Sequence, residues 1–190
     1  MEGDTTTIGG VDGPKFVGYP AGIAVAKDGT VFVSTYGNSN AVCIISPDGT
    51  ITTLAGGEEP GFADGRGEAA RFSNPTGMAM GPDGRLYVAD ACNDSIRCVD
   101  RNGNVSTVAG RPTEEGAERE SIDGDLTVAR FNSPYAVAVA SDGTIYVGEE
   151  DGERVRQIRE GVVSTVCQCG TVRQSRLAAV ASTRAACRRR

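Results

Sequence analysis

The chain has 190 residues, of which 39% are hydrophobic and 23% charged, which excludes an intrinsically disordered protein and fits one globular unit. Glycine is abundant at 26 residues and tryptophan is absent, which indicates many short strands joined by tight turns. The formal charge is −6, yet residues 171–190 contain six arginines and no acidic residue, so the rest of the chain is strongly acidic. An acidic surface repels a phosphate backbone, which argues against nucleic-acid binding except through this tail.

No run of eighteen apolar residues occurs that could cross a membrane as a helix. The amino terminus, MEGDTTTIGG, lacks both the basic start and the apolar stretch of a secretory signal. The sequence therefore predicts a soluble protein with no membrane partner and a cytoplasmic location.

One sequence unit occurs three times: PAGIAVAKDGTVFV from Pro20, PTGMAMGPDGRLYV from Pro75 and PYAVAVASDGTIYV from Pro134. After each copy come a polar turn, an apolar run, a second turn and a closing run, so each unit offers four short strands. Repeats of this period are typical of stacked units. The predicted fold is all-β, with three tandem four-stranded antiparallel blades of a β-propeller, forming an open arc or half of a six-bladed ring.

The repeat divides the chain into five segments. They are an outer strand of a missing blade at 1–10, blade 1 at 11–57, blade 2 at 58–110, blade 3 at 111–170, and a basic tail at 171–190 that is disordered or loosely helical. The first segment is assigned because its TTTIGG matches the closing strand TTLAGG. Three blades leave apolar faces uncovered at both ends of the arc. We therefore expect self-association or a longer parent chain to complete the ring.

Each unit contains an Asp-Gly pair between its first two strands, which predicts a hairpin turn, since glycine tolerates a positive φ and aspartate bonds the local backbone. The pairs are Asp28-Gly29, Asp83-Gly84 and Asp142-Gly143.

The two connectors between blades are DGRGEAARFSNP, from Asp64, and DGDLTVARFNSP, from Asp123, and they match in register at Asp, Gly, Ala, Arg, Phe and Pro. Phe72 and Phe131 are predicted to fill the space between neighbouring sheets. Arg71 and Arg130 are expected to tie the connector to acceptors on the adjoining blade. The alternative is that these two arginines face a ligand.

The second unit resembles the NHL-repeat family of β-propellers, in which a strand ending in Tyr-Val-Ala-Asp is followed by an Asn and an Ile-Arg strand. Its LYVADACNDSIRCVD places Asp90, Asn93, Ile96 and Arg97 on that pattern. The resemblance covers about residues 5–167.

The other two units depart from the family pattern. In the first unit we align Ser34 with Asp90, Asn38 with Asn93 and Val42 with Arg97. The third unit keeps Val155 and Arg156, but has Gly148 or Glu149 at the Asp position and Gly152 at the Asn position.

The resemblance implies binding of proteins or RNA, because the NHL family is known mainly for these roles, whereas related propellers are lyases and hydrolases. We expect a non-catalytic scaffold with a protein partner. The first alternative is part of a metal-dependent hydrolase or lyase that is complete only in a longer chain or oligomer. The second is RNA binding through the arginine-rich tail.

Four polar residues on the blade loops are the candidates for a binding surface: Asp90, Asn93, Arg97 and Arg156. The alternative for the carboxylate and amide of the Asp90 and Asn93 pair is that they satisfy local backbone donors at a tight turn.

The sequence contains no histidine, which removes the commonest general base and the commonest transition-metal ligand. Cys43 and Cys98 are interpreted as equivalent packed positions of two blades. The acids at 149–151 are expected to form a solvated loop or a weak Ca²⁺ contact. No catalytic residue, metal ligand or cofactor is therefore predicted.

Overall fold

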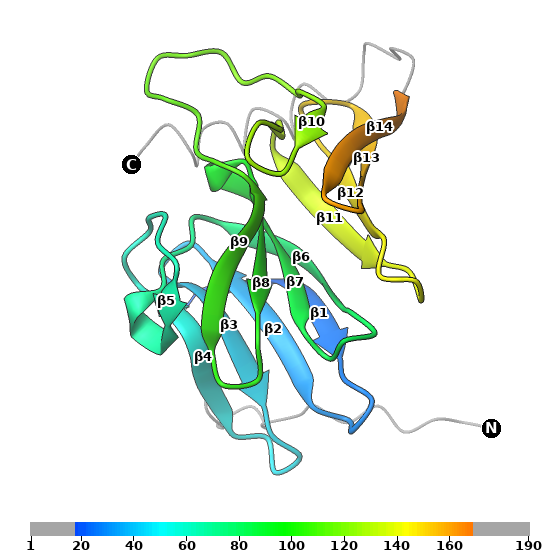
Figure 1. The fold of residues 1–190 in the computed structure, drawn as a ribbon. Coiled ribbons are helices and arrows are strands. Elements are labelled where there is room, and N and C mark those ends of the chain that lie inside the picture. The colour runs from blue at the N-terminus through cyan, green and yellow to red at the C-terminus, as the bar shows by residue number, and fades with distance from the viewer. Residues whose placement is uncertain (1–17, 169–190) are drawn as a thin grey trace, which may run out of the picture.

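The computed structural model describes residues 18–168, which form three antiparallel sheets standing side by side in an arc (Figure 1). The sheets are blades of a β-propeller, as predicted. The outer strand expected at 1–10 and the tail at 171–190 lie outside the described residues. Within these residues, no helix is long and apolar enough to span a membrane.

Each blade is a meander whose four main strands pair in chain order. Blade 1 consists of β1 (Tyr19–Val25), β2 (Val31–Tyr36), β3 (Asn40–Ile45) and β4 (Ile51–Gly57). Blade 2 contains β6 (Pro75–Met80), β7 (Leu86–Asp90), β8 (Ser95–Val99) and β9 (Asn104–Gly110). Blade 3 contains β11 (Pro134–Val139), β12 (Ile145–Glu149), β13 (Arg154–Arg159) and β14 (Val162–Gln168).

Blades 2 and 3 each have a fifth, two-residue strand that the sequence pattern did not reveal. These strands, β5 (Gly65–Arg66) and β10 (Gly124–Asp125), belong to the connectors and pair with the outer strands β9 and β14. Two 3-10 turns complete the elements: η1 (Gly67–Ala69) in a connector and η2 (Ala91–Asn93) between β7 and β8. Each connector is therefore fastened along the outer edge of the blade that it precedes.

The three Asp-Gly pairs form the predicted hairpin turns. Gly29 has φ of +86°, a left-handed value that glycine adopts without steric cost. The carboxylate of Asp28 accepts a hydrogen bond from the backbone N–H of Thr30 at 3.1 Å, and the other two aspartates do the same. These aspartates therefore serve turn geometry.

The hydrophobic core lies between the blades, in two clusters. Phe72 is fully buried in the first, among side chains of blades 1 and 2, and Phe131 is fully buried in the second, among side chains of blades 2 and 3. Both phenylalanines fill the space between sheets, as predicted.

The innermost strands β1, β6 and β11 approach one another closely, which explains a glycine in the first two. A Cβ on Gly22 would lie 2.3 Å from the carbonyl oxygen of Thr76, and one on Gly77 would lie 2.5 Å from that of Tyr135. The residue at the same place in β11 is Ala136.

Strand pairing corrects the alignment of the first unit. Cys43 lies opposite Val33, just as Arg97 lies opposite Val88 and Arg156 opposite Val147. Cys43 therefore takes the place of Arg97. The predicted equivalence of Cys43 with Cys98 and that of Val42 with Arg97 are wrong, because each is out by one residue.

The same correction applies to the other polar positions of blade 1. Thr35 lies opposite Pro20 as Asp90 lies opposite Pro75, so Thr35, not Ser34, corresponds to Asp90. The Thr35 hydroxyl lies 3.2 Å from that of Ser39, which replaces the expected Asn38.

The close contact between β6 and β11 predicts that one methyl group added at Gly77 lowers the stability of the protein. Gly77→Ala should destabilise the protein by about 1–3 kcal/mol, because the added Cβ forces β6 and β11 apart. Gly57→Ala is the matched control, since a Cβ there meets nothing within 4 Å, and it should change stability by less than about 0.5 kcal/mol. Urea unfolding measures both, and equal costs would contradict the interpretation.

Candidate functional site

A buried arginine fastens each connector to its blade at the end where the connectors lie. In blade 2 the fully buried Arg97 donates to the carbonyl oxygens of Arg71 at 3.0 Å and Ala63 at 2.8 Å, on the two sides of the connector. The same guanidinium pairs with Asp64 at 2.6 Å and with Asp90 at 2.8 Å. One side chain thus joins strand β8 to both arms of the preceding loop.

Asp90 connects this arginine to the neighbouring turn. Its Oδ2 accepts from Asn93 Nδ2 at 2.8 Å, and its Oδ1 accepts from the backbone N–H of Ser73 at 2.7 Å. Asn93 also donates to the carbonyl oxygen of Gly61. Asp90 and Asn93 therefore satisfy backbone and side-chain groups around the turn, which is the second of the two interpretations given above.

Blade 3 repeats the arrangement with a longer acid. Arg156 is fully buried, pairs with Glu149 at 2.8 Å and Asp123 at 2.6 Å, and donates to the carbonyl oxygens of Arg130 and Ile122. The acid of the third unit is thus Glu149, which resolves the choice between Gly148 and Glu149.

Arg71 and Arg130 act locally. Arg71 donates to the carbonyl oxygens of Glu68 and Ala70 within its own connector, and Arg130 donates to those of Val128 and Ala129. The expected tie to the adjoining blade is wrong for these two residues, because the buried Arg97 and Arg156 make that connection from the strands.

The two carboxylates of Arg97 have pKa values shifted in opposite directions. Complete burial raises the pKa of Asp90 to about 6, against the opposing effect of the Arg97 charge. Partial burial also disfavours ionised Asp64, but hydrogen bonds from Thr107 and Arg97 outweigh it and lower the pKa of Asp64. Desolvation therefore dominates the pKa of the fully buried Asp90, whereas hydrogen bonds dominate the pKa of the more exposed Asp64.

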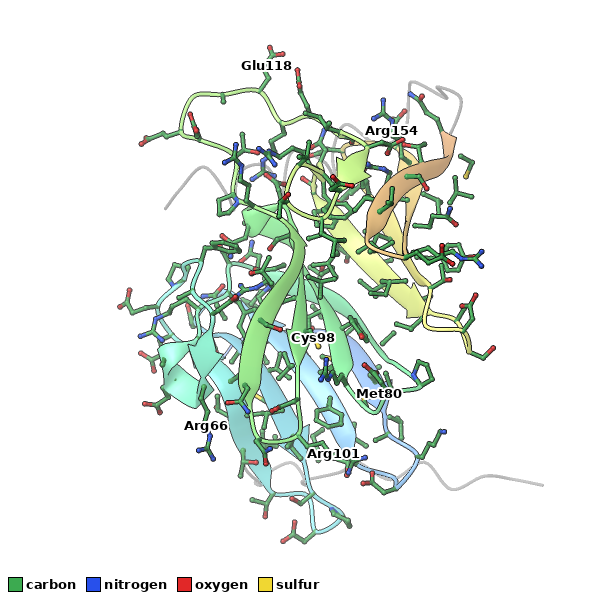
Figure 2. All side chains as sticks on the ribbon, in the orientation of Figure 1. Arg66, Met80, Cys98, Arg101, Glu118 and Arg154 are labelled. Atoms are coloured by element: carbon green, nitrogen blue, oxygen red, sulfur yellow. The ribbon has the colours of Figure 1, made fainter. Side chains whose placement is uncertain are left out.

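A cleft of about 400 Å³ opens at the connector end of blade 3. It lies between the loop that joins β9 to β10 and the turn that joins β12 to β13. Its lining residues are Arg119, Glu120, Ser121, Asn132, Asp151, Gly152 and Arg154. Figure 2 shows Glu118 on the outer part of the loop and Arg154 at the same end of the molecule.

Asp94 holds this loop in place from blade 2. The carboxylate is buried and accepts from the Thr113 hydroxyl at 2.7 Å and from the backbone N–H of Ser133 at 3.1 Å. It also pairs with Arg119 Nε at 3.2 Å. Burial raises the pKa of Asp94, while the Arg119 charge opposes this effect. One aspartate thus orders both sides of the connector that borders the cleft.

The structure places the four predicted binding residues beneath the loops. Asp90, Asn93 and Arg97 belong to one buried network and Arg156 to another, and none of them lines the cleft. Their role in binding stays a prediction. Within residues 18–168 no group of three or more His, Cys, Asp or Glu side chains could hold a metal ion.

Comparison with known proteins agrees with the architecture. Residues 72–99, which run from Phe72 to the end of β8, match the family model "NHL repeat". The chain is an NHL-repeat protein. The matched segment contains Asp90, Asn93 and Arg97, so the NHL pattern coincides with the buried network.

The chain is also similar in sequence to parts of larger proteins. It is 29% identical over 150 residues to the NHL repeat-containing protein 2 of Bos taurus, covering 72% of this chain and 20% of that protein. It is 34% identical over 128 residues to the virginiamycin B lyase of Nocardia farcinica, covering 67% of this chain and 35% of the lyase. The chain thus spans a small part of the relatives that it matches.

A solved structure from Bacteroides thetaiotaomicron, of a protein of unknown function, superimposes on the NHL blades with a TM-score of 0.64 and 29% identity. The match covers 80% of this chain and 36% of that protein. The shared feature is the blade arrangement.

The buried ion pair predicts an asymmetric response to equivalent mutations. Asp90→Asn should destabilise the protein by about 3–5 kcal/mol, because it leaves the fully buried Arg97 without its inner charge partner. Asp48→Asn makes the same chemical change at an exposed turn, where the free energy of unfolding should change far less. Urea unfolding midpoints compare the two variants. Similar losses would mean that the buried pair does not hold the connector.

The lowered pKa of Asp64 predicts a contribution to acid unfolding. Its stabilisation is present above the ordinary aspartate pKa of about 4 and is lost as pH falls through the lower folded-state pKa. Asp64→Asn should therefore lose less stability than the unmodified chain between pH 5 and pH 2, measured by urea unfolding at each pH. Glu59→Gln removes an exposed acid of the same connector and serves as the control. A parallel loss in Asp64→Asn and the unmodified chain would contradict the assignment.

Proposed function

We propose that the chain is a protein-interaction scaffold that binds its partner at the connector end of the blades. The observation that carries this proposal is the cleft beside the loop from β9 to β10, because it is a recessed surface on loops that ion pairs to the buried acids Asp94 and Glu149 hold in place. Loops positioned by a rigid scaffold are the usual location of binding residues.

The buried networks support the scaffold role indirectly. Asp90, Asn93, Arg97 and Arg156 fix the connectors, and we propose that they contribute to binding by positioning these loops rather than by touching the partner. The carboxylates of Asp90 and Glu149 are directed to arginines and backbone donors of their own blade. The acids are therefore engaged in holding structure.

The proposal predicts that a partner contacts the connector end of the blades and not the opposite end. A photo-crosslinking residue at Glu118, on the connector end, should capture a partner from an extract of the source organism. The same residue at Asp48, in the turn between β3 and β4 at the opposite end of the blade, should capture none. Mass spectrometry of the products measures both. Capture from position 48 alone, or from neither position, would contradict the proposal.

A metal-dependent lyase or hydrolase is the second candidate, favoured by the 34% identity to virginiamycin B lyase. This activity belongs to the relative, and here it would require residues from a longer chain or an oligomer. Turnover of virginiamycin B by a purified protein that retains stoichiometric divalent metal would favour this candidate over the scaffold.

Several further expectations stay predictions. They are RNA binding through residues 171–190, completion of the ring by a second copy or a longer chain, and a cytoplasmic location. The native mass of the purified protein addresses the second of these.

A further inference from the structure

Blades 2 and 3 each bind an aspartate of their own connector at the same place on the outer strand. Asp64 accepts hydrogen bonds from the backbone N–H of Thr107 at 3.0 Å and from its hydroxyl at 2.9 Å. Asp123 accepts the same two bonds from Thr165, both at 3.0 Å. The glycine after each aspartate begins the short strand, β5 or β10, that pairs with this edge. An Asp-Gly segment thus occupies the outer edge of both blades.

The outer strand of blade 1 has the receiving threonine, but no Asp-Gly segment among residues 18–168 lies on it. The sheet of blade 1 ends at β4, with no described strand on its far side. Thr53 of β4 lies opposite Cys43, as Thr107 lies opposite Arg97. Thr53 therefore stands where a connector aspartate binds in the other two blades, and its side chain is exposed.

The edge of β4 also leaves an apolar residue partly uncovered. Ile51 is half-buried, whereas Val105 and Val163, which take its place in blades 2 and 3, are buried. These two valines lie opposite Gly65 and Gly124 of the connector strands. An open strand edge presents backbone groups that pair readily with an added strand. Blade 1 thus has a strand-binding edge of the kind that the other two blades fill.

The sequence just before the described residues has the features of a connector. Residues 11–16 are VDGPKF, and the two connectors contain the same DG, basic residue and Phe, in DGRGEAARF and DGDLTVARF. The glycine is required by the backbone, because Gly65 and Gly124 have φ of +152° and +150°. Gly13 meets this requirement, and Asp12 precedes it as in the connectors.

The chain enters blade 1 at the place from which the connectors of the other blades start. Gly18, the first described residue, lies against the turn between β2 and β3, since a Cβ on it would lie 2.6 Å from the carbonyl oxygen of Tyr36. In blades 2 and 3 the carbonyl oxygens of Ser73 and Ser133, just after the connector phenylalanines, accept hydrogen bonds from the equivalent turns. The segment before Gly18 is therefore attached at the position of a connector.

The segment is shorter than the connectors, yet long enough to reach β4. In blade 2 the two arms of the connector meet at the bridge between Ala63 and Arg71, so that Asp64 lies beside the arm that leads to the blade. In blade 1 a single turn over residues 12–14 brings Asp12 beside Lys15, the residue aligned with Arg71. Asp, Gly and Pro are the residues that favour such turns.

From these observations we propose that residues 11–16 bind the outer edge of β4 as an added strand, with the Asp12 carboxylate accepting hydrogen bonds from the N–H and hydroxyl of Thr53. The proposal is independent of the scaffold function. Covalent attachment keeps the segment at a high effective concentration beside this edge. Because Cys43 replaces the buried arginine, no guanidinium pairs with Asp12 or ties the two arms of the segment. Blade 1 thus holds its connector more weakly than blades 2 and 3 hold theirs.

Hydrogen exchange of the Thr53 backbone amide, followed by NMR on the full chain, tests this contact. Asp12→Ala should raise the exchange rate at least about tenfold, because the carboxylate acceptor is lost. Asp4→Ala makes the same change elsewhere in the amino-terminal segment and should leave the rate unchanged. The Thr107 amide of the same sample, which bonds to Asp64, shows that the blades stay folded. Equal Thr53 rates in Asp12→Ala and the unmodified chain would overturn the proposal.

A second variant tests the added strand itself. Gly13→Val should also speed exchange at Thr53, because a β-branched residue disfavours the positive φ of the connector glycines. Gly3→Val is its control and should have no effect. An effect of Gly3→Val equal to that of Gly13→Val would contradict a specific contact. In the unmodified chain Thr53 should exchange faster than Thr107, and slower exchange would contradict the weaker attachment.

Protein concentration distinguishes the segment from a second copy of the chain. Binding within one chain gives protection of the Thr53 amide that does not change on dilution. Protection that falls as the protein is diluted would mean that another copy covers the edge of β4, and the proposal would then be wrong.

Discussion

The structure depends on a buried guanidinium that has to be satisfied. Arg97 and Arg156 lie on central strands with no exposed surface, and an uncompensated charge there would cost several kcal/mol. The compensation comes from two carboxylates and from backbone carbonyls on both arms of the connector. Satisfying the charge therefore fixes the path of the loop, and the loop carries the surface where binding is proposed.

Blade 1 shows that these positions change as a set. Cys43 replaces the arginine, and Thr35 and Ser39 replace the acid and the amide, so these three positions of blade 1, all within the described residues, are uncharged. Burial raises the pKa of the Cys43 thiol, which keeps it uncharged. A blade with only one of the ionic members would bury an unpaired charge, so the ionic and neutral versions do not mix.

Much of the fold could be predicted from sequence because its signals are local and occur three times. The Asp-Gly turns and Phe72 and Phe131 each follow from residue type and position. The alignment of blade 1 failed because five residues separate the paired positions Thr35 and Ala41, whereas four separate the equivalent pair Asp90 and Ser95. A one-residue slip exchanges the faces of a strand.

The candidate site was less accessible to sequence reasoning. Nothing in the pattern separates Arg97, which is buried in the blade, from Arg71, which bonds only within its connector, because both lie beside apolar residues. The cleft is lined in part by the small residues Ser121 and Gly152. Small residues leave space open in many places of a fold, so their presence in a sequence does not predict a cleft. A signal did exist, because aligning the third unit with the second shows that Ser121 stands in place of Phe62 and Gly152 in place of Asn93. Only the fold shows that these two positions lie beside the same cleft.

The innermost strand of blade 3 has Ala136 where the innermost strands of blades 1 and 2 have glycine. At the first two interfaces a glycine lets a carbonyl oxygen of the following strand approach to where a methyl group would lie. Ala136 has that methyl group on the open side of β11, so a sheet that covers β11 has to stand further away than β6 and β11 stand from their predecessors. A further blade packed against β11 would therefore stand at a wider spacing, so the spacing of the first two interfaces does not give the number of blades in a closed ring.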